Sequence, residues 1–405
     1  MAKSTKSIVL FTRWFPYNKW KEISFLEDEM ICLSNNYKSL TLVPQEIYGE
    51  RYDLPEDVIS DESLAAKFNR IGLKEKLAVV FSIHFIRELF NIGFNRNKRK
   101  YSVTALLSAI VIRNWILDSF SKEKQMVFYS FWVDYTTLGA VLAANKAPNW
   151  RVVSRCHNFD LYGNEENGYY VPYQALILKR LNAVYPDSLA GEEYIREKFM
   201  LNNVQAQIMG VSDPGYSNEG SKDGTFRAFS CSYMIQRKRV ILIASGMILL
   251  AEKNPTNSFV WTHIGGGEEM KLIQDLVLKS PSNIKINLLG SLTNIELDNF
   301  YRNQPIDVFI NVSEKEGTPV SLMESISFGI PVLVSGFGGN KEVANQGGGI
   351  VLTENPTAEE IAQELNKFRT SCNIDESKRM ARDTWNKHYN SVSNYQVFSE
   401  KIDAL

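Results

Sequence analysis

The sequence has few cysteines, almost no net charge and no long hydrophobic run. Four scattered cysteines without a C-x-x-C pair argue against a disulfide framework or a zinc site, and fit free thiols in a reducing compartment. With 45 Lys and Arg against 46 Asp and Glu, bulk positive charge for binding nucleic acid is excluded. The longest apolar stretch, residues 240–251, falls short of the roughly 20 residues of a membrane span. We therefore expect a soluble cytoplasmic protein without a signal peptide or transmembrane helix.

Short apolar runs rich in β-branched residues recur along the 405 residues, and helical patterns lie between them. Because most runs are apolar on both faces, they predict parallel strands covered by helices, so the fold class is doubly wound α/β. A polar, Gly- and Ser-rich segment at 212–224 predicts a boundary between an N-terminal domain, 1–215, and a C-terminal domain, 216–385. Residues 376–405 predict one terminal helix, of which 386–405 packs back on the first domain. The expected strands are 8–12, 39–43, 126–132, 152–156, 183–185, 227–233, 258–264, 284–289, 306–312, 331–335 and 349–352.

One segment differs from the rest in charge. Residues 67–124 hold 12 Lys or Arg and 4 Asp or Glu, a net charge of +8, interleaved with apolar residues. Such a basic amphipathic segment can lie on an anionic membrane surface or hold a polyanionic acceptor. The alternative is a set of ordinary core-facing helices with a solvated basic face.

The stretch 307–343, DVFINVSEKEGTPVSLMESISFGIPVLVSGFGGNKEV, predicts strand, loop, helix and strand. Thr318 is expected to cap the helix and Pro319 to take its first position. A helix start at the carboxyl end of a parallel strand is an anion site, where the amides of Val320 and Ser321 can face a diphosphate. Glu316 lies just before this helix and Glu324 inside it, and carboxylates pair well with vicinal hydroxyls. Taken singly, either glutamate could instead be a capping or solvated acid.

This stretch resembles the signature of the retaining GT4 family of glycosyltransferases, which have the GT-B fold of two Rossmann-like domains facing a cleft. The resemblance implies that Glu316 contacts the transferred sugar, that Glu324 holds the nucleotide ribose, and that residues 317–321 hold sugar and diphosphate. Many members have glycine where this chain has Pro319, which has no amide to donate. The matching residues are Glu316, Glu324, Ser325, Gly329, Pro331, Gly338, Gly339 and Glu342.

Two further stretches resemble donor loops of the same family. FSCSYMIQRKRVILIASGM matches a strand and a loop that carries an arginine and a lysine for the donor diphosphate. Lys238 takes the lysine position, Tyr233 stands where the arginine is usual, and Arg237 or Arg239 is left to compensate. THIGGGEEM matches the loop beside the nucleotide, where Gly266 lies in a glycine turn that permits close approach.

The N-terminal domain carries the acceptor-side matches. In SRCHNFDLYG, the residues Arg155, His157 and Asp160 cluster at a strand's carboxyl end. A histidine at this place approaches the reacting sugar in similar enzymes, whereas a histidine satisfied within the core is the plain alternative. The opening loop resembles the family's loop that faces both substrates, but with bulkier residues, namely Tyr17, Lys19 and Trp20. Ser188 follows another strand and is expected to cap the next helix.

The resemblance implies transfer of a sugar from a nucleotide-diphosphate sugar, UDP-sugar favoured, to an acceptor hydroxyl with retention at the anomeric carbon. No Asp-x-Asp pair is present, so Lys238 and the helix start would stabilise the leaving diphosphate without metal or other cofactor. The expected acceptor is a lipid-linked glycan of capsule, O-antigen or teichoic-type polymer at the inner face of the membrane. The alternatives are a non-catalytic GT-B partner subunit and a GT-B epimerase or phosphorylase.

Overall fold

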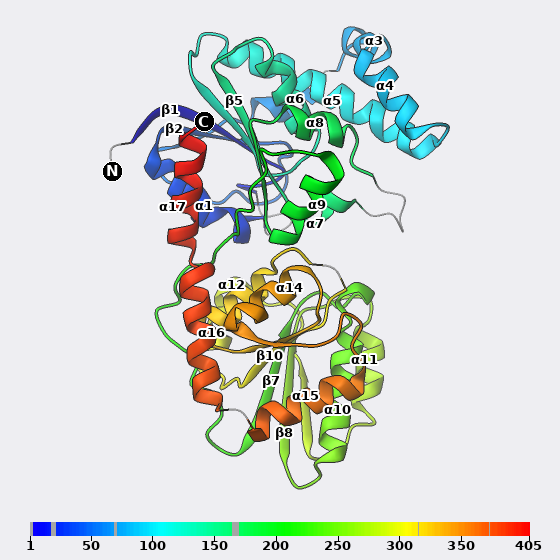
Figure 1. The fold of residues 1–405 in the computed structure, drawn as a ribbon, viewed down its shortest axis with the longest axis vertical. Coiled ribbons are helices and arrows are strands. Elements are labelled where there is room, and N and C mark those ends of the chain that lie inside the picture. Colours follow the sequence, from blue (N-terminus) through cyan, green and yellow to red (C-terminus); the bar gives the residue numbers. More distant parts are fainter. Residues whose placement is uncertain (1–2, 18–21, 69–70, 164–169, 315, 372) are drawn as a thin grey trace. The chain divides into compact units, whose positions relative to one another are not determined.

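Figure 1 shows a computed structural model of the chain, which describes residues 3–17, 22–68, 71–163, 170–314, 316–371 and 373–405. Lys19 and Trp20, two of the bulky residues of the opening loop, and Cys372 lie outside these residues. The chain divides into two compact units. Unit 1 comprises Met1–Gln207 with Val392–Leu405, and unit 2 comprises Ile208–Ser391.

Unit 1 is built on a six-stranded parallel sheet with the order β3-β2-β1-β4-β5-β6. This is the strand order of a Rossmann-type open sheet. The order in which strands are added along the sheet reverses at the neighbouring strands β1 and β4, which we call the reversal point. The strands are β1 Ser4–Thr12, β2 Tyr37–Pro44, β3 Val58–Ser60, β4 Met126–Ser130, β5 Trp150–Cys156 and β6 Ala183–Pro186. The helices are α1 Ile23–Asn36, α2 Ser63–Phe68, α3 Leu73–Val80, α4 Ile83–Ile92, α5 Arg96–Phe120, α6 Tyr135–Ala144, α7 Asn158–Tyr162, α8 Gln174–Arg180, α9 Leu189–Phe199 and α17 Ser391–Asp403.

Unit 2 repeats the same order in its own strands, β9-β8-β7-β10-β11-β12, again all parallel. Its reversal point lies between β7 and β10. The strands are β7 Thr225–Cys231, β8 Ser258–Ile264, β9 Ile284–Leu288, β10 Val308–Asn311, β11 Val332–Val334 and β12 Gly349–Val351. The helices are α10 Val240–Lys253, α11 Met270–Val277, α12 Asn294–Asn303, α13 Val320–Ser327, α14 Gly338–Val343, α15 Ala358–Ser371 and α16 Ile374–His388, with short turns η1 Gln236–Lys238 and η2 Ala344–Gly348.

The α/β fold class and all eleven expected strands are confirmed, whereas β3 was not predicted. The expected single terminal helix over 376–405 is wrong. It is two helices, α16 and α17, separated where Asn390 pairs with Val211 and where Ser391 packs on Gly210. A Cβ at Gly210 would lie 2.5 Å from the backbone of Ser391, so this crossing of two chain segments needs glycine.

Within the described ranges, α5 is the one helix long and apolar enough to cross a membrane by length and composition alone. Its apolar side chains lie in the core of unit 1, as Leu106, Ile112 and Trp115 do. Helix α6 packs directly against α5. A Cβ at Gly139 of α6 would lie 2.7 Å from the Ile112 side chain of α5, so this close packing needs glycine. The buried apolar side of α5 therefore belongs to the core of unit 1.

Candidate active site

The two loops at the reversal point of unit 2 carry the charged residues that the sequence singled out. Strands β7 and β10 are neighbours, and the loops that leave their carboxyl ends hold Lys238 and Glu316 respectively. In open parallel sheets this reversal point is where ligands bind. The fold thus brings together two residues that lie 78 positions apart.

These two loops are joined by a set of polar contacts. The Lys238 ammonium donates to the Glu316 carboxylate, and both side chains are mostly buried. One step further out, the Arg239 guanidinium pairs with Glu314 at 3.2 Å, and the Glu314 amide donates to the Arg237 carbonyl at 3.0 Å. Arg239 also donates to the Glu354 carbonyl and to Asn355, so it is fully engaged. Of the two candidates for the missing diphosphate arginine, Arg237 is the exposed one, and Tyr233 itself is 61% exposed.

Helix α13 begins one residue later than expected. Its N-cap is Pro319, not Thr318, and Val320 is its first residue. The reason is the backbone of Pro319, whose φ of −67° and ψ of 129° are extended, as a cap residue requires. Because Pro319 has no amide, the first-turn donors without an intrahelical partner are those of Val320 and Ser321. Thr318 is buried beneath this turn.

Two glycine turns support these loops by close approach. A Cβ at Gly339, the first turn of α14, would lie 1.9 Å from the Gly317 carbonyl oxygen, so only glycine lets α14 pack on the loop before α13. A Cβ at Gly265 would lie 1.8 Å from the Ser232 carbonyl oxygen, so the glycine turn after β8 packs directly on the loop after β7. A Cβ at Gly266 would lie 3.7 Å from the Ser291 hydroxyl, an ordinary contact, so space alone does not require glycine there.

Glu324 lies in the second turn of α13 and is half-buried. None of the described residues donates a hydrogen bond to its carboxylate or pairs with it as a cation. Burial raises the pKa of Glu324 to about 7. A half-buried carboxylate whose pKa is raised by burial alone is stabilised in its charged form when a ligand donates to it. The Glu324 carboxylate thus keeps its capacity to accept hydrogen bonds.

Glu324→Gln is expected to stabilise ligand-free unit 2 at pH 8 and to have little effect near pH 4.5. The folded protein binds the Glu324 proton more tightly than the unfolded chain does, so this group's contribution to stability falls as the pH rises from its ordinary pKa to about 7. Glutamine stays neutral and escapes that loss. Thermal midpoints of both proteins between pH 4.5 and pH 8 check this, with Glu359→Gln, an exposed helical position of unit 2, as the control. Equal midpoints across the range would contradict the burial argument.

In unit 1, the loops at the reversal point are organised by Glu22, which the sequence analysis did not single out. Its carboxylate accepts hydrogen bonds from the amides of Trp14 and Phe15, both at 2.7 Å, and from the Trp132 indole at 2.7 Å. It thereby joins the loop after β1 to the loop after β4. The available signal was a carboxylate between an apolar strand and a helix, which is too common to be decisive.

His157 follows β5 and lies beside this cluster. Its ring packs between Phe131 and Trp132, with ring centroids 4.5 and 4.6 Å away. Asp160 fixes the loop, because its carboxylate accepts from the His157 amide at 2.5 Å and from the Val133 amide at 2.7 Å. Neither ring nitrogen of His157 has a hydrogen-bond partner among the described residues. The imidazole packs against these two tilted rings, and its Nδ1 lies 3.9 Å from the Asp160 carboxylate, beyond hydrogen-bond distance.

Two of the acceptor-side predictions fall on buried side chains. Arg155 is fully buried and pairs with Glu29 at 2.9 Å, so its guanidinium faces the interior and cannot meet an acceptor, which corrects that prediction. The side chain of Tyr17 is also buried, and its hydroxyl donates to Glu62 at 2.6 Å. Ser188 caps α9 as expected, accepting from the Gly191 amide at 3.2 Å.

A pocket of about 600 Å³ lies elsewhere in unit 1, between α4, α5, α8 and α9. Its walls include Glu88, Lys98, Tyr170 and Lys198, and none of the residues singled out from the sequence is among its described lining. In the part of the chain that the structure describes, no three His, Cys, Asp or Glu side chains gather as a metal site would require.

Comparison with known proteins agrees with this geometry. Residues 219–384, nearly all of unit 2, match the family model of "Glycosyl transferases group 1". The O-antigen biosynthesis glycosyltransferase WbnH of Escherichia coli is 29% identical over 178 residues, which cover 42% of this chain and 47% of WbnH. This chain's match thus spans about half the length of that curated relative.

Two further relatives cover most of the chain. The GtfA subunit of the UDP-N-acetylglucosamine–peptide N-acetylglucosaminyltransferase of Streptococcus parasanguinis is 23% identical over 381 residues, 90% of this chain and 69% of GtfA. Anabaena HepE, solved in complex with UDP and glucose, superposes with a TM-score of 0.63 at 12% identity, over 99% of this chain and 100% of HepE. At that identity the likeness shows the fold alone, and that fold is GT-B.

Proposed function

We propose that this chain is a group 1 glycosyltransferase, the family whose model residues 219–384 match, and that it moves a sugar from a nucleotide-diphosphate sugar to an acceptor hydroxyl. The observation that carries the proposal is the pairing of Lys238 with Glu316 at the reversal point of unit 2, directly before the free first-turn amides of α13. A cation and helix amides suit a diphosphate, and a carboxylate suits sugar hydroxyls.

The proposed reaction breaks the bond between the anomeric carbon and the donor phosphate oxygen, and it forms a bond from that carbon to the acceptor oxygen. The leaving diphosphate takes the electron pair, and its charge is stabilised by Lys238 and by the amides of Val320 and Ser321. We propose retention of configuration, with the acceptor proton passing to the departing phosphate oxygen. No metal ion is needed in this scheme.

Donor binding changes the partners of the two central residues. In the ligand-free chain Lys238 is neutralised by Glu316. When a diphosphate takes Lys238, the Glu316 carboxylate is released to accept hydrogen bonds from the transferred sugar. Glu324 would accept from the ribose hydroxyls, which supply the donors that its buried carboxylate lacks. On the acceptor side, unit 1 would contribute His157, oriented by its stacking and by Asp160.

For the acceptor, we propose a lipid-linked glycan in the synthesis of a surface polysaccharide. WbnH, the relative named for O-antigen biosynthesis, supports this class. A second candidate is a protein hydroxyl, because the likeness to the peptide-modifying GtfA subunit runs over 90% of the chain whereas that to WbnH covers 42%. Transfer assays with lipid-extracted glycans and with peptides that carry serine and threonine hydroxyls separate the two acceptors.

The donor proposal predicts a nucleotide-specific thermal shift without metal. In buffer containing EDTA, a UDP-sugar should raise the thermal midpoint in a concentration-dependent way, more than GDP-, ADP- or dTDP-sugars do. UDP is favoured because HepE, which shares the fold, binds it. A ligand at 100 times its Kd stabilises the folded state by about 2.7 kcal/mol. If no nucleotide sugar shifts the midpoint, the donor site is wrongly assigned. A shift that is present with added metal but absent in EDTA would contradict only the metal-free scheme.

A further inference from the structure

Two short helices of unit 1, α3 and α4, present apolar side chains to solvent. In each helix the exposed apolar residues recur at helical spacing, i, i+4, i+7 in α3 and i, i+3, i+7 in α4, so each set forms one stripe. In a helix of a globular protein such a stripe faces the core. Here the stripe side chains are between 43% and 84% exposed. They are Leu73, Leu77, Val80, Ile83, Ile86 and Phe90.

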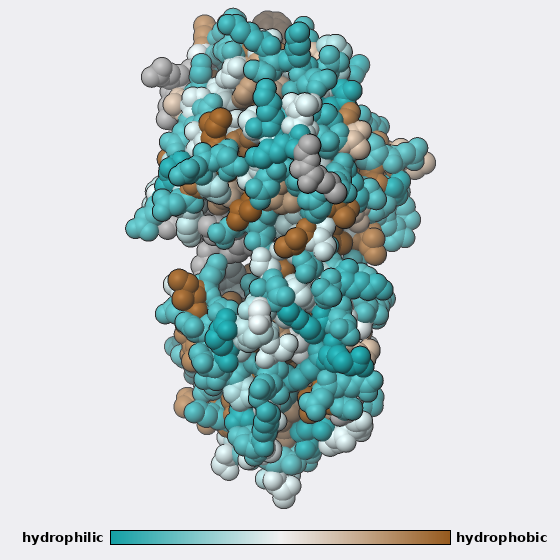
Figure 2. Space-filling model, turned by 90° about the vertical axis from the view of Figure 1, so that its left-hand side faces the viewer, coloured by the Kyte–Doolittle hydropathy of each residue, from teal (hydrophilic) through white to brown (hydrophobic). Residues whose placement is uncertain are grey.

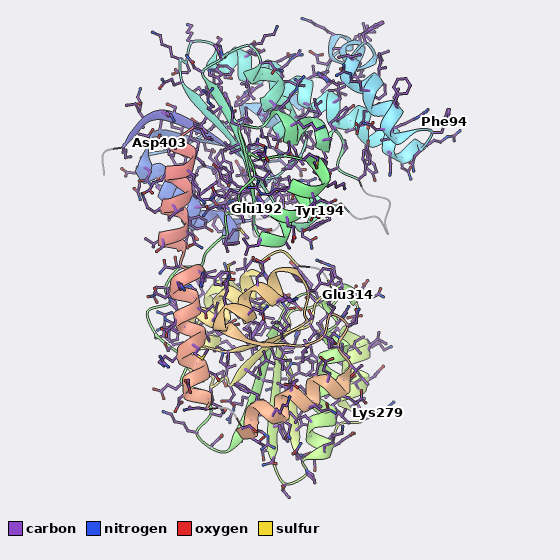
Figure 3. All side chains as sticks on the ribbon, in the orientation of Figure 1. Phe94, Glu192, Tyr194, Lys279, Glu314 and Asp403 are labelled. Atoms are coloured by element: carbon purple, nitrogen blue, oxygen red, sulfur yellow. The ribbon has the colours of Figure 1, made fainter. Side chains whose placement is uncertain are left out.

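Two phenylalanines extend this surface. Phe81, between the helices, is 79% exposed, and Phe94, after α4, is 91% exposed. Figure 3 shows Phe94 directed away from the body of unit 1, at the end of α4. We call these two residues and the six stripe residues the apolar face. This face holds eight of the 25 strongly exposed large hydrophobic residues in the described chain, within only 22 consecutive positions.

Such a concentration is not general on this protein. Figure 2 views the molecule from the side that in unit 1 lies opposite α3 and α4, and there the hydrophobic residues are scattered among hydrophilic ones. Scattered exposed hydrophobics need no explanation, whereas eight exposed apolar side chains gathered on two neighbouring helices indicate an interaction surface.

The helices that carry the apolar face are fixed to unit 1. On their inner sides Val79 is buried and Phe85 packs against the core. Glu88 is also buried, and its carboxylate accepts from the Tyr173 amide at 3.0 Å, which ties α4 to the start of α8. The outward direction of the stripes therefore follows from packing on the opposite side of each helix.

The surroundings of the apolar face are basic. Residues 73–100 contain seven Lys or Arg and two Glu, a net charge of +5. Both glutamates are engaged locally, Glu75 by the Gly72 amide at 3.0 Å and Glu88 in the interior. The cations remain at the surface, and Arg99 lies over the Phe94 ring at 5.0 Å. The exposed cations are Lys74, Lys76, Arg87, Arg96 and Lys100.

We propose that the apolar face and its basic surroundings dock unit 1 on an anionic lipid bilayer. Aromatic and aliphatic side chains enter the boundary between head groups and acyl chains, while Lys and Arg meet the anionic head groups. Charge decides the choice of partner, since each Lys or Arg near an anionic bilayer strengthens binding by about fivefold. Docking itself is inferred from the apolar face and its charges. Only its consequence, that a lipid-linked acceptor is met at the bilayer surface, rests on the proposed function.

The test is flotation of the full-length protein with vesicles of phosphatidylcholine alone or with added phosphatidylglycerol. The protein should float with the anionic vesicles at low salt and less at high salt, because exposed charges are screened. Phe90→Glu and Phe94→Glu should each weaken flotation about tenfold or more, through lost apolar burial. Charge reversal at Lys74, Lys76 and Arg87 should remove the dependence on phosphatidylglycerol and salt.

The matched control is Leu278→Glu with Ile295→Glu in unit 2, two positions 85% and 76% exposed that should float like wild type. Thermal midpoints show that each variant is folded, and the nucleotide-sugar shift shows that donor binding is intact. Flotation that survives both phenylalanine substitutions overturns the proposal. So does a wild-type protein that ignores vesicles and instead forms a dimer dissociated by Phe90→Glu. Either failure leaves the nucleotide-sugar result standing, so it is distinct from a failure of the proposed function.

Discussion

Glu316→Gln should lower the turnover rate of sugar transfer by roughly 10²–10³-fold, while leaving the fold and nucleotide binding nearly intact. A charged hydrogen-bond partner that is preorganised at the reacting centre contributes at this level. Glutamine keeps the shape of the side chain but lacks the negative charge that pairs with Lys238 and with a developing positive charge on the sugar ring. Glu316 lies in a loop between β10 and α13, so the fold should persist, but loss of its charge leaves Lys238 without its partner and should lower the thermal midpoint somewhat.

The matched control for this prediction is Glu314→Gln, two residues earlier in the same loop. Glu314 is 44% exposed and pairs with Arg239, an arrangement worth about 0–1 kcal/mol. The Glu314→Gln variant should retain the wild-type rate of transfer and the wild-type thermal midpoint. Turnover is measured as nucleotide released in the presence of acceptor, and nucleotide affinity is measured separately. Near-normal turnover in Glu316→Gln, or an equal loss in Glu314→Gln, would remove the role assigned to Glu316.

The site of unit 2 was predictable because its information is local in sequence. The stretch 307–343 contains a buried strand, a loop, a helix start and a second strand in order, and parallel topology places every such loop at one edge of the sheet. The pairing of Lys238 with Glu316 follows once β7 and β10 are neighbours. The error of one residue at Thr318 arose because proline suits both the cap and the first helical position.

The site of unit 1 was less predictable because its contacts are long-range. Glu22 lies 110 positions from Trp132, and Glu29 lies 126 positions from Arg155. Nothing in the string SRCHNFD tells which of its polar residues faces the edge and which faces inward. In β5 successive side chains alternate between the two faces of the sheet, but helices cover both faces, so burial of Arg155 depends on what those helices supply. Here α1 supplies Glu29 and α17 supplies Phe398.

The basic segment 67–124 shows a different limit. Its net charge and interleaved apolar residues were evident in the sequence, but core-facing and solvent-facing helices share that pattern. Only the packing assigns α5 to the core and leaves the stripes of α3 and α4 outside. The pattern of an amphipathic helix shows which side is apolar. It does not show whether that side is covered by the protein core or by a partner.

Breaking the buried Glu29–Arg155 pair should have the largest effect on stability. Arg155→Met leaves the Glu29 carboxylate inside unit 1 with the Tyr129 hydroxyl as its described donor, and Glu29→Met leaves a guanidinium that retains the Gln207 carbonyl at 2.6 Å and the Phe398 ring. Burial already raises the pKa of Glu29, although Arg155 and Tyr129 oppose this. An uncompensated buried charge costs about 3–5 kcal/mol, so each single variant should lose about that much free energy of unfolding.

The double variant Glu29→Met with Arg155→Met separates a lost attraction from an orphaned charge. With neither charge present, the methionines fill similar volume, and the loss should be smaller than that of either single variant. Urea denaturation of the three proteins, followed by a signal from unit 1, measures the differences. Because Phe398 covers the guanidinium, α17 should loosen in Arg155→Met, and amide exchange along 391–403 should rise. Additive losses in the double variant would mean that the pair stabilises unit 1 by attraction itself, and not merely by keeping two buried charges matched.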